Sequence, residues 1–116
     1  MTLREALDRR DLEGFVAALD PEVVWLGLEE PGEERPMCRN RDEVRSVLEE
    51  FLAAGRNASP EIVAEADDSL VIDPHPEPPV PGREQIHHVY TLRDGLVVRM
   101  EDYPDRASAL AAVGLP

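Results

Sequence analysis

The sequence predicts an α+β fold, in which one strongly curved antiparallel sheet wraps around a long helix as a cone-shaped roll. Helical patterns dominate the chain before residue 56, whereas strand-like segments follow one another after it. A short helical pattern closes the chain. Helices that are segregated onto one face of an antiparallel sheet define the α+β class. The mouth of such a cone can hold a small molecule.

The first 19 residues favour two consecutive helices. Thr2 and Glu5 have the spacing of a capping box, and apolar residues recur on one face after them. Asp11 is a plausible N-cap for the second helix. We expect that helix to end at residues 20–21 (Asp-Pro), because a residue that precedes proline is biased away from helical backbone angles.

A strand and the longest helix come next. Residues 22–28 (EVVWLGL) form a continuous apolar run, which predicts a strand covered on both faces. Residues 29–39 are charged and contain two prolines, as in a loop. Asn40 and Glu43 can cap the helix that follows, whose apolar residues recur at i, i+3, i+4, i+7 and i+8. Gly55 is expected to close this helix.

The second half of the chain reads as strands joined by turns. The proline-rich stretch PHPEPPVPG (residues 74–82) is predicted to blunt a sheet edge. Pro104 fits the first position of a short C-terminal helix that ends at Gly114. The predicted strands are residues 61–67, 69–73, 83–92 and 96–103.

Composition bounds the class of protein. The 116 residues suffice for one domain, which we expect to span residues 1–116. Hydrophobic residues make up 42% and charged residues 32%, as in soluble globular proteins. No stretch resembles a transmembrane helix or a secretion signal, and the single cysteine, Cys38, cannot form an internal disulfide. We therefore expect a cytoplasmic location, and the absence of lysine beside abundant alanine and arginine suggests a GC-rich bacterial genome.

The charge balance argues against several partners. The net charge is −13, and all 12 basic residues are arginine. Such a chain repels nucleic-acid backbones and anionic membranes, so we expect neither as a partner. No glycine-rich phosphate loop or Ser-His-Asp pattern is present, and the three histidines lack metal-ligand spacing. We expect no cofactor and no metal.

The element order and several motifs resemble the nuclear transport factor 2-like superfamily in its SnoaL-like branch. The motifs are the Asp94-Gly95 turn, the Asp102-Tyr103 pair, the Ala-rich tail at residues 109–115 and the helix start at residues 40–45. The resemblance implies a cystatin-like α+β roll over almost the whole chain. It implies little about activity, since the superfamily hosts isomerases, dehydratases, epoxide hydrolases, cyclases and non-enzymes.

Two registers are open for the hairpin around residues 94–95. A three-residue loop with a G1 bulge places His88 opposite Met100. A two-residue turn shifts the pairing by one and places His87 opposite Asp102. The apolar pattern favours the first register, with His88 inside the cone as a diagonal neighbour of Asp102 and His87 facing solvent or a partner subunit.

The pair His88 and Asp102 is the candidate catalytic pair. An imidazole beside a carboxylate in an apolar cavity can abstract a proton next to a carbonyl. The resemblance agrees, because isomerase-like members have an oxyanion-stabilising acid near the position of His88, and SnoaL-like cyclases have a histidine and an aspartate at similar spacing. The isomerase's general base, however, would fall near Leu26. The candidate ligand-binding residues are Leu26, Phe51, Ile86, Tyr90, Val98 and Met100.

Two functions remain open at this point. The first is binding of a small, largely apolar molecule, with isomerase- or cyclase-like proton transfer through His88 and Asp102. The second is a non-catalytic binding or interaction module with a self-filled pocket, in which His88 is a hydrogen-bonded core histidine. A homodimer through the outer sheet face is expected in either case, because Val89, Val97 and Tyr103 on that face would benefit from cover.

Overall fold

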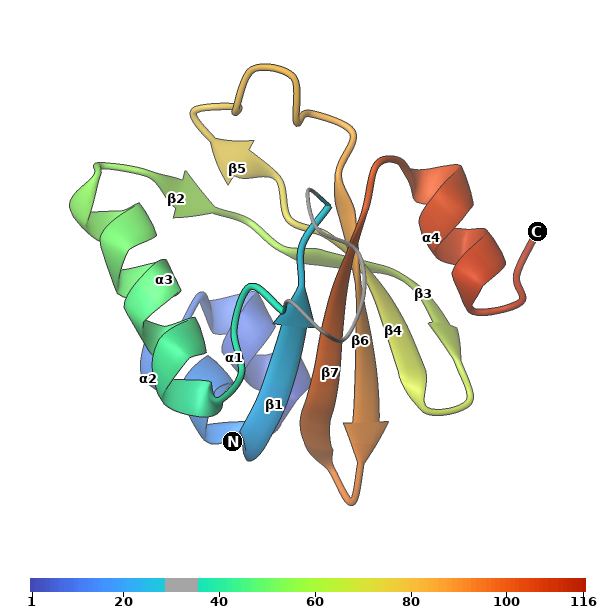
Figure 1. The fold of residues 1–116 in the computed structure, drawn as a ribbon, viewed down its shortest axis with the longest axis horizontal. Helices are drawn as coiled ribbons and strands as arrows, with labels where there is room; N and C mark the ends of the chain where they lie inside the picture. The colour runs from blue at the N-terminus through green and yellow to red at the C-terminus, as the bar shows by residue number, and fades with distance from the viewer. Residues whose placement is uncertain (29–35) are drawn as a thin grey trace.

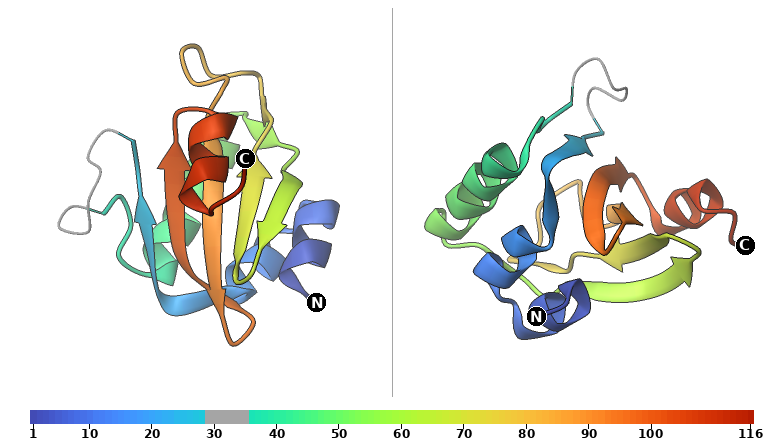
Figure 2. Two further views of the ribbon diagram at one scale, coloured as in Figure 1. Left: turned by 90° about the vertical axis from the view of Figure 1, so that its right-hand side faces the viewer. Right: turned by 90° about the horizontal axis from the view of Figure 1, so that it is seen from below.

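The computed structural model describes residues 1–28 and 36–116. It confirms an α+β fold with a curved sheet, whose five main strands are ordered β1-β7-β6-β4-β3 (Figure 1). Helices α1, α2 and α3 lie on one side of this sheet, and α4 lies on the other (Figure 2). The elements are α1 Leu3–Arg9, α2 Leu12–Ala17, β1 Leu19–Leu26, α3 Arg41–Ala53, β2 Asn57–Ala58, β3 Glu61–Ala66, β4 Ser69–Asp73, β5 Pro76–Glu77, β6 His87–Arg93, β7 Leu96–Tyr103 and α4 Arg106–Ala112.

The N-terminal helices are capped as predicted. The Thr2 hydroxyl accepts a hydrogen bond from the backbone N–H of Glu5, and the Asp11 carboxylate accepts one from that of Gly14. The expected end of the second helix is wrong, because α2 stops at Ala17 and residues 20–21 already belong to β1. Proline is tolerated there because β1 is an edge strand.

The sheet is mixed rather than fully antiparallel. Strand β1 runs parallel to β7, whereas the other neighbouring strands are antiparallel. Most of the predicted charged loop at residues 29–39 lies outside the described residues, but Cys38 bridges back to the backbone of Trp25 and is fully buried.

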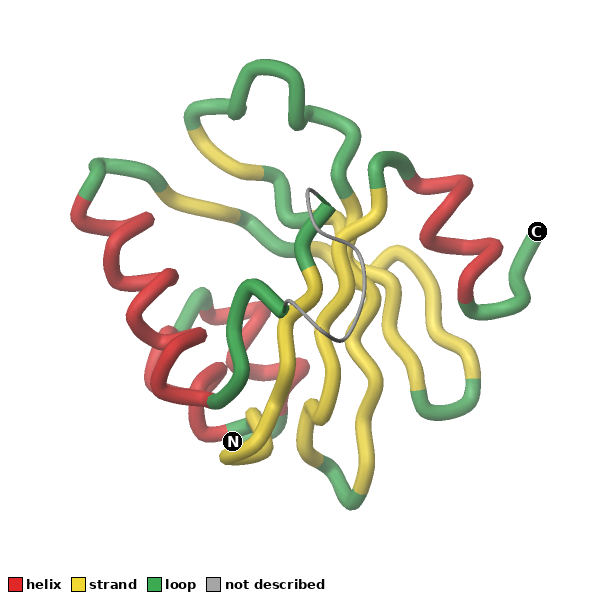
Figure 3. The backbone as a smooth tube through the Cα atoms, viewed as in Figure 1, coloured by secondary structure: helices red, strands yellow, loops and turns green. Residues whose placement is uncertain are grey.

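Helix α3 begins as the sequence indicates. The Asn40 side chain accepts a hydrogen bond from the Glu43 backbone N–H, and Gly55 has a positive φ of 80° just after the helix. The proline-rich segment does more than blunt an edge, because β5 within it pairs with β2 as a small second sheet (Figure 3). Residues 83–86 form a turn instead of the start of a strand.

Neither predicted register for the β6–β7 hairpin is fully right. Asp94 and Gly95 have φ values of 53° and 82°, so the turn has two residues and is of the mirror-image type that hairpins favour. A bulge in β7 then shifts the pairing by one residue between Thr91 and Leu92. The result places His88 directly opposite Asp102 instead of Met100.

The bulge also changes which residues face the core. Val97 is fully buried in the inner core together with Met100, whereas Val98, predicted to point inward, is only partly buried and outside that core. His87, predicted to face solvent or a partner, is 5% exposed. Both sheet faces are therefore covered, the outer one by α4, whose Ala109 packs with β4 and β6.

Candidate functional site

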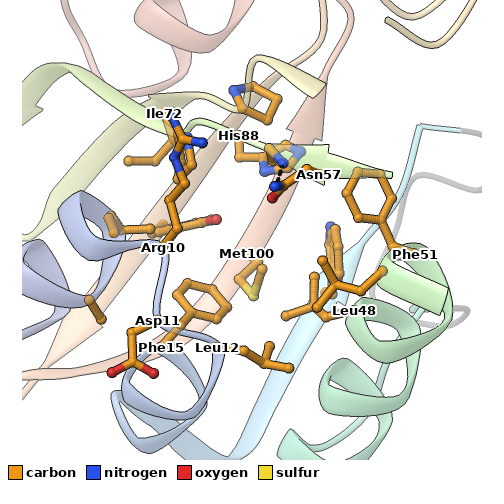
Figure 4. A pocket seen from close by; sticks show the side chains of 18 residues that line it. Arg10, Asp11, Leu12, Phe15, Leu48, Phe51, Asn57, Ile72, His88 and Met100 are labelled. Atoms are coloured by element: carbon orange, nitrogen blue, oxygen red, sulfur yellow. Dashed lines mark hydrogen bonds between the residues drawn. The ribbon is translucent and has the colours of Figure 1, made fainter. Parts of the chain in front are cut away.

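A cavity of about 170 Å³ lies between the N-terminal helices, α3 and the inner face of the sheet. Its wall is almost entirely apolar and comes from elements that are distant in the sequence (Figure 4). Because burial of apolar surface is favourable, such a wall suits an apolar ligand. Prominent apolar lining residues are Phe15, Leu48, Phe51, Ile72 and Met100.

His88 projects from β6 into this wall and faces a carboxylate. The His88 Nε2 atom lies 3.5 Å from Asp102 Oδ1, which is longer than a good hydrogen bond. The same oxygen accepts a hydrogen bond of 2.7 Å from the indole Nε1–H of Trp25. The indole and imidazole rings meet edge to face, with their centroids 5.9 Å apart. Trp25 thus fixes the carboxylate that His88 faces.

Burial favours a neutral His88. Desolvation lowers the pKa of the imidazole, and this outweighs the opposing effect of Asp102. A carboxylate beside Nε2 favours a proton on that atom, which leaves a lone pair on Nδ1. The Nδ1 atom is buried and has no hydrogen-bond partner within residues 1–28 and 36–116. An unpaired buried nitrogen costs about 1–3 kcal/mol, so its presence on a residue that lines the cavity is informative.

Tyr90 adds a second polar group to the wall. Burial, with a smaller effect from Asp102, raises the pKa of its phenol well above the ordinary value, so the hydroxyl keeps its proton. The ring packs against Phe15 at a centroid distance of 5.9 Å.

The predicted ligand-binding residues divide into two groups. Phe51, Tyr90 and Met100 line the cavity, as does His88. The structure places the other predicted residues, Leu26, Ile86 and Val98, outside the lining, and Asp102 lies behind His88 and Trp25 rather than at the surface of the cavity.

Each misplaced residue has a local cause. Neighbouring strand residues point to opposite faces, so Trp25 faces the cavity where Leu26 does not. Ile86 precedes the start of β6 and does not continue its alternation, and the bulge turns Val98 away. The amphipathic patterns around Phe15 and Leu48 could have indicated two further lining residues.

The second histidine belongs to a separate polar cluster on the opposite face. His87 Nδ1 donates a hydrogen bond of 2.8 Å to the carbonyl of Gln85, and its Nε2 accepts one of 3.3 Å from Arg106 of α4. The carboxylate of Asp73 lies 3.6 Å from His87 Nε2. This cluster ties α4 to the sheet.

Other candidate chemistries find little support in the described residues. No group of three or more His, Cys, Asp and Glu side chains among them is placed to hold a metal ion. Burial raises the pKa of the Cys38 thiol to about 11, which makes it a poor nucleophile. Within residues 1–28 and 36–116, no helix has the length and apolar character needed to cross a membrane.

Comparisons with solved structures agree on the fold. A candidate polyketide cyclase from Sinorhizobium meliloti is 17% identical, with a TM-score of 0.61 over 87% of this chain and 89% of that one. A cystatin-fold protein from Novosphingobium aromaticivorans is 13% identical, with a TM-score of 0.62 over 85% and 89%. TerC, co-crystallised with polyporic acid, is 18% identical, with a TM-score of 0.55 over 94% and 89%.

The comparison with family models settles the family. No protein of known, curated function matches the chain. The model of the SnoaL-like domain matches residues 2–100, which is most of the chain and includes the Asp-Gly turn and the helix start, and it confirms the resemblance to this branch. The protein belongs to the SnoaL-like domain family.

Proposed function

We propose that this protein binds a small, largely apolar molecule in the cavity, and that His88 orients the molecule through a hydrogen bond. The observation that carries the proposal is a neutral imidazole nitrogen that has no hydrogen-bond partner among the described residues, on a residue that lines a mostly apolar cavity. Ligand sites commonly combine an apolar wall with a few polar groups that fix orientation. As a support of lower weight, the similar protein TerC was crystallised with polyporic acid.

The polarity of His88 specifies what the ligand must offer. A lone pair on Nδ1 accepts a hydrogen bond and cannot donate one. The ligand therefore carries a hydroxyl or N–H group beside a compact apolar body. The open volume of about 170 Å³ favours a ligand-binding cavity over the self-filled pocket considered from the sequence. Binding without catalysis remains compatible with this volume.

The single tryptophan of the chain supplies a native reporter for this proposal. Trp25 lines the cavity, so occupancy should change its emission. We expect saturable changes with indane, 2-indanone and 2-indanol. The alcohol should bind tightest by about twofold to tenfold, because only it donates to Nδ1 and one hydrogen bond contributes about 0.5–1.5 kcal/mol. Replacement of His88 by Phe should remove this preference.

Two variants locate the binding. Ala58→Leu puts extra volume into the cavity wall and should weaken binding of all three probes, whereas Ala53→Leu adds the same volume at an exposed position of α3 outside the lining. Absence of a saturable change with every probe, or equal weakening by both variants, would contradict the proposal.

Proton transfer is a second candidate function, favoured by the carboxylate that faces His88. In this reaction Nδ1 takes a proton from the carbon next to a ketone, and the electrons of the C–H bond form an enolate. In D₂O a deuteron then returns to carbon. Faster deuterium incorporation into 2-indanone with the wild type than with His88→Gln, followed by NMR, would support it. Equal rates of deuterium incorporation in the two proteins would leave ligand binding without proton transfer as the function.

A further inference from the structure

Arg10 connects α1 to α2 and has a left-handed backbone conformation, which is unusual for a residue with a long side chain. Its φ and ψ are 53° and 42°, in the left-handed region, and its backbone N–H donates to the carbonyls of Ala6 and Leu7. Glycine or asparagine usually fills such a helix end, because other residues pay about 1–2 kcal/mol there. Only the backbone N–H of residue 10 makes the cap, so the cap does not explain why this position holds an arginine.

The Arg10 side chain is exposed and lines the cavity. In Figure 4 it runs along one wall toward Ile72. No hydrogen bond or ion pair joins its guanidinium to another residue in the parts of the chain that the structure describes. The neighbouring Arg9, by contrast, pairs with Glu5 at 3.9 Å. Carboxylates are abundant, with 25 acidic residues against 12 arginines, so their scarcity does not account for the lack of a partner.

One acidic residue also lines the cavity. Asp11 follows Arg10 in the chain, and its Oδ1 accepts a hydrogen bond of 3.0 Å from the Gly14 backbone N–H as the N-cap of α2. The other titratable lining residues are His88 and Tyr90, both favoured in the neutral form. Among the described residues, the cavity wall thus presents one cation without an ion-pair partner and one carboxylate that caps a helix.

We infer that the ligand also carries a carboxylate, which lies against Arg10 while the apolar body fills the cavity and the hydroxyl or N–H group meets His88. This inference rests on the binding function proposed above. A guanidinium can donate two parallel hydrogen bonds to a carboxylate. The protein as a whole repels anions, given its net charge of −13, so an anionic ligand requires a local cation at the site.

A matched pair of probes tests the inference. The acid 4-phenylbutyrate and its uncharged methyl ester share one apolar body, neither donates a hydrogen bond to His88, and Trp25 emission follows both. The wild type should bind the acid about threefold to tenfold more tightly, as expected for a partly exposed charged pair. Added salt should reduce this difference, because exposed charges are screened.

Two variants with the same charge change complete the test. Arg10→Gln should bind both probes with equal affinity, whereas Arg9→Gln should keep the preference for the acid. Equal binding of acid and ester by the wild type, or an unchanged preference in Arg10→Gln, would overturn the inference. So would binding of 2-indanol without binding of the acid. Only a failure of the indane series as well would count against the binding function itself.

Discussion

Replacing His88 by Gln should remove a destabilisation that the wild type acquires at acidic pH. Glutamine can still donate to Asp102 but cannot take up a proton. The pKa of the folded-state imidazole is lowered by burial, from an ordinary value of 6.5, despite the neighbouring carboxylate. Below pH 6.5 the unfolded chain therefore binds a proton that the folded protein does not, and the stability of the folded state falls as the pH falls.

The size of this effect follows from proton linkage. Stability changes by at most about 1.4 kcal/mol per pH unit for one group, so the wild type should lose up to about 1.4 kcal/mol relative to His88→Gln between pH 8 and pH 5.5. The assay is urea unfolding of both proteins at pH 8, 6.5 and 5.5, followed by circular dichroism. Effects of the many carboxylates are common to both proteins and cancel in the difference.

The sign of the stability difference between the wild type and His88→Gln decides whether burial or Asp102 dominates the pKa of His88. Burial and Asp102 act on His88 in opposite directions, and burial is the larger effect. A wild type that gained stability relative to His88→Gln on acidification would mean that the carboxylate wins and that His88 is a cation in the fold. Parallel pH profiles would refute the reasoning equally, because they would show no change of imidazole pKa on folding.

Three further predictions concern the surroundings of the site. Trp25→Phe removes the 2.7 Å hydrogen bond to Asp102 and should lower the free energy of unfolding by about 1.5–3 kcal/mol in urea titrations; a loss below about 0.5 kcal/mol would show that this bond contributes little. Met100→Ala removes apolar volume at a buried position in the cavity wall and should lower the free energy of unfolding by about 2–5 kcal/mol, measured in the same way; a neutral result would show that neighbouring side chains fill the space. Cys38 should react with a thiol reagent such as Ellman's reagent only after unfolding, because it is buried and its pKa is raised to about 11; rapid labelling of the native protein would contradict this.

Local sequence signals account for much of the fold. The caps formed by Thr2, Asp11 and Asn40 satisfy backbone groups within a few residues, so their presence can be recognised in the sequence. The Asp-Gly pair marks the β6–β7 turn for the same reason. These features depend on short-range geometry, and the family match at residues 2–100 confirms the architecture they imply.

The register of the hairpin could not be obtained in this way. A bulge depends on how β7 packs against β1 and the core, and neither the Val97-Val98 pair nor the turn reveals it. The one extra residue in β7 places His88 directly opposite Asp102, which neither predicted register does. The role of Trp25 was missed for a related reason, since a strand buried on both faces shows no alternation.

The homodimer stays a prediction, but the apolar residues from which it was inferred are covered within the same chain. Val89 and Tyr103, expected to need a partner subunit, pack with α4 of the same chain, and Val97 lies in the inner core. Sedimentation at micromolar protein will decide whether a dimer forms. A dimer would have to use other surfaces, or the outer side of α4.

The most direct test of the proposed site is the ¹⁵N chemical shift of His88 Nδ1 in the presence of a ligand. The proposal predicts a resonance typical of an unprotonated imidazole nitrogen at neutral pH, which moves to lower frequency on addition of 2-indanol and stays unchanged with indane. A protonated Nδ1 in the free protein would contradict the account. The account would also be contradicted if the Nδ1 resonance did not shift on addition of 2-indanol while Trp25 emission showed saturable binding.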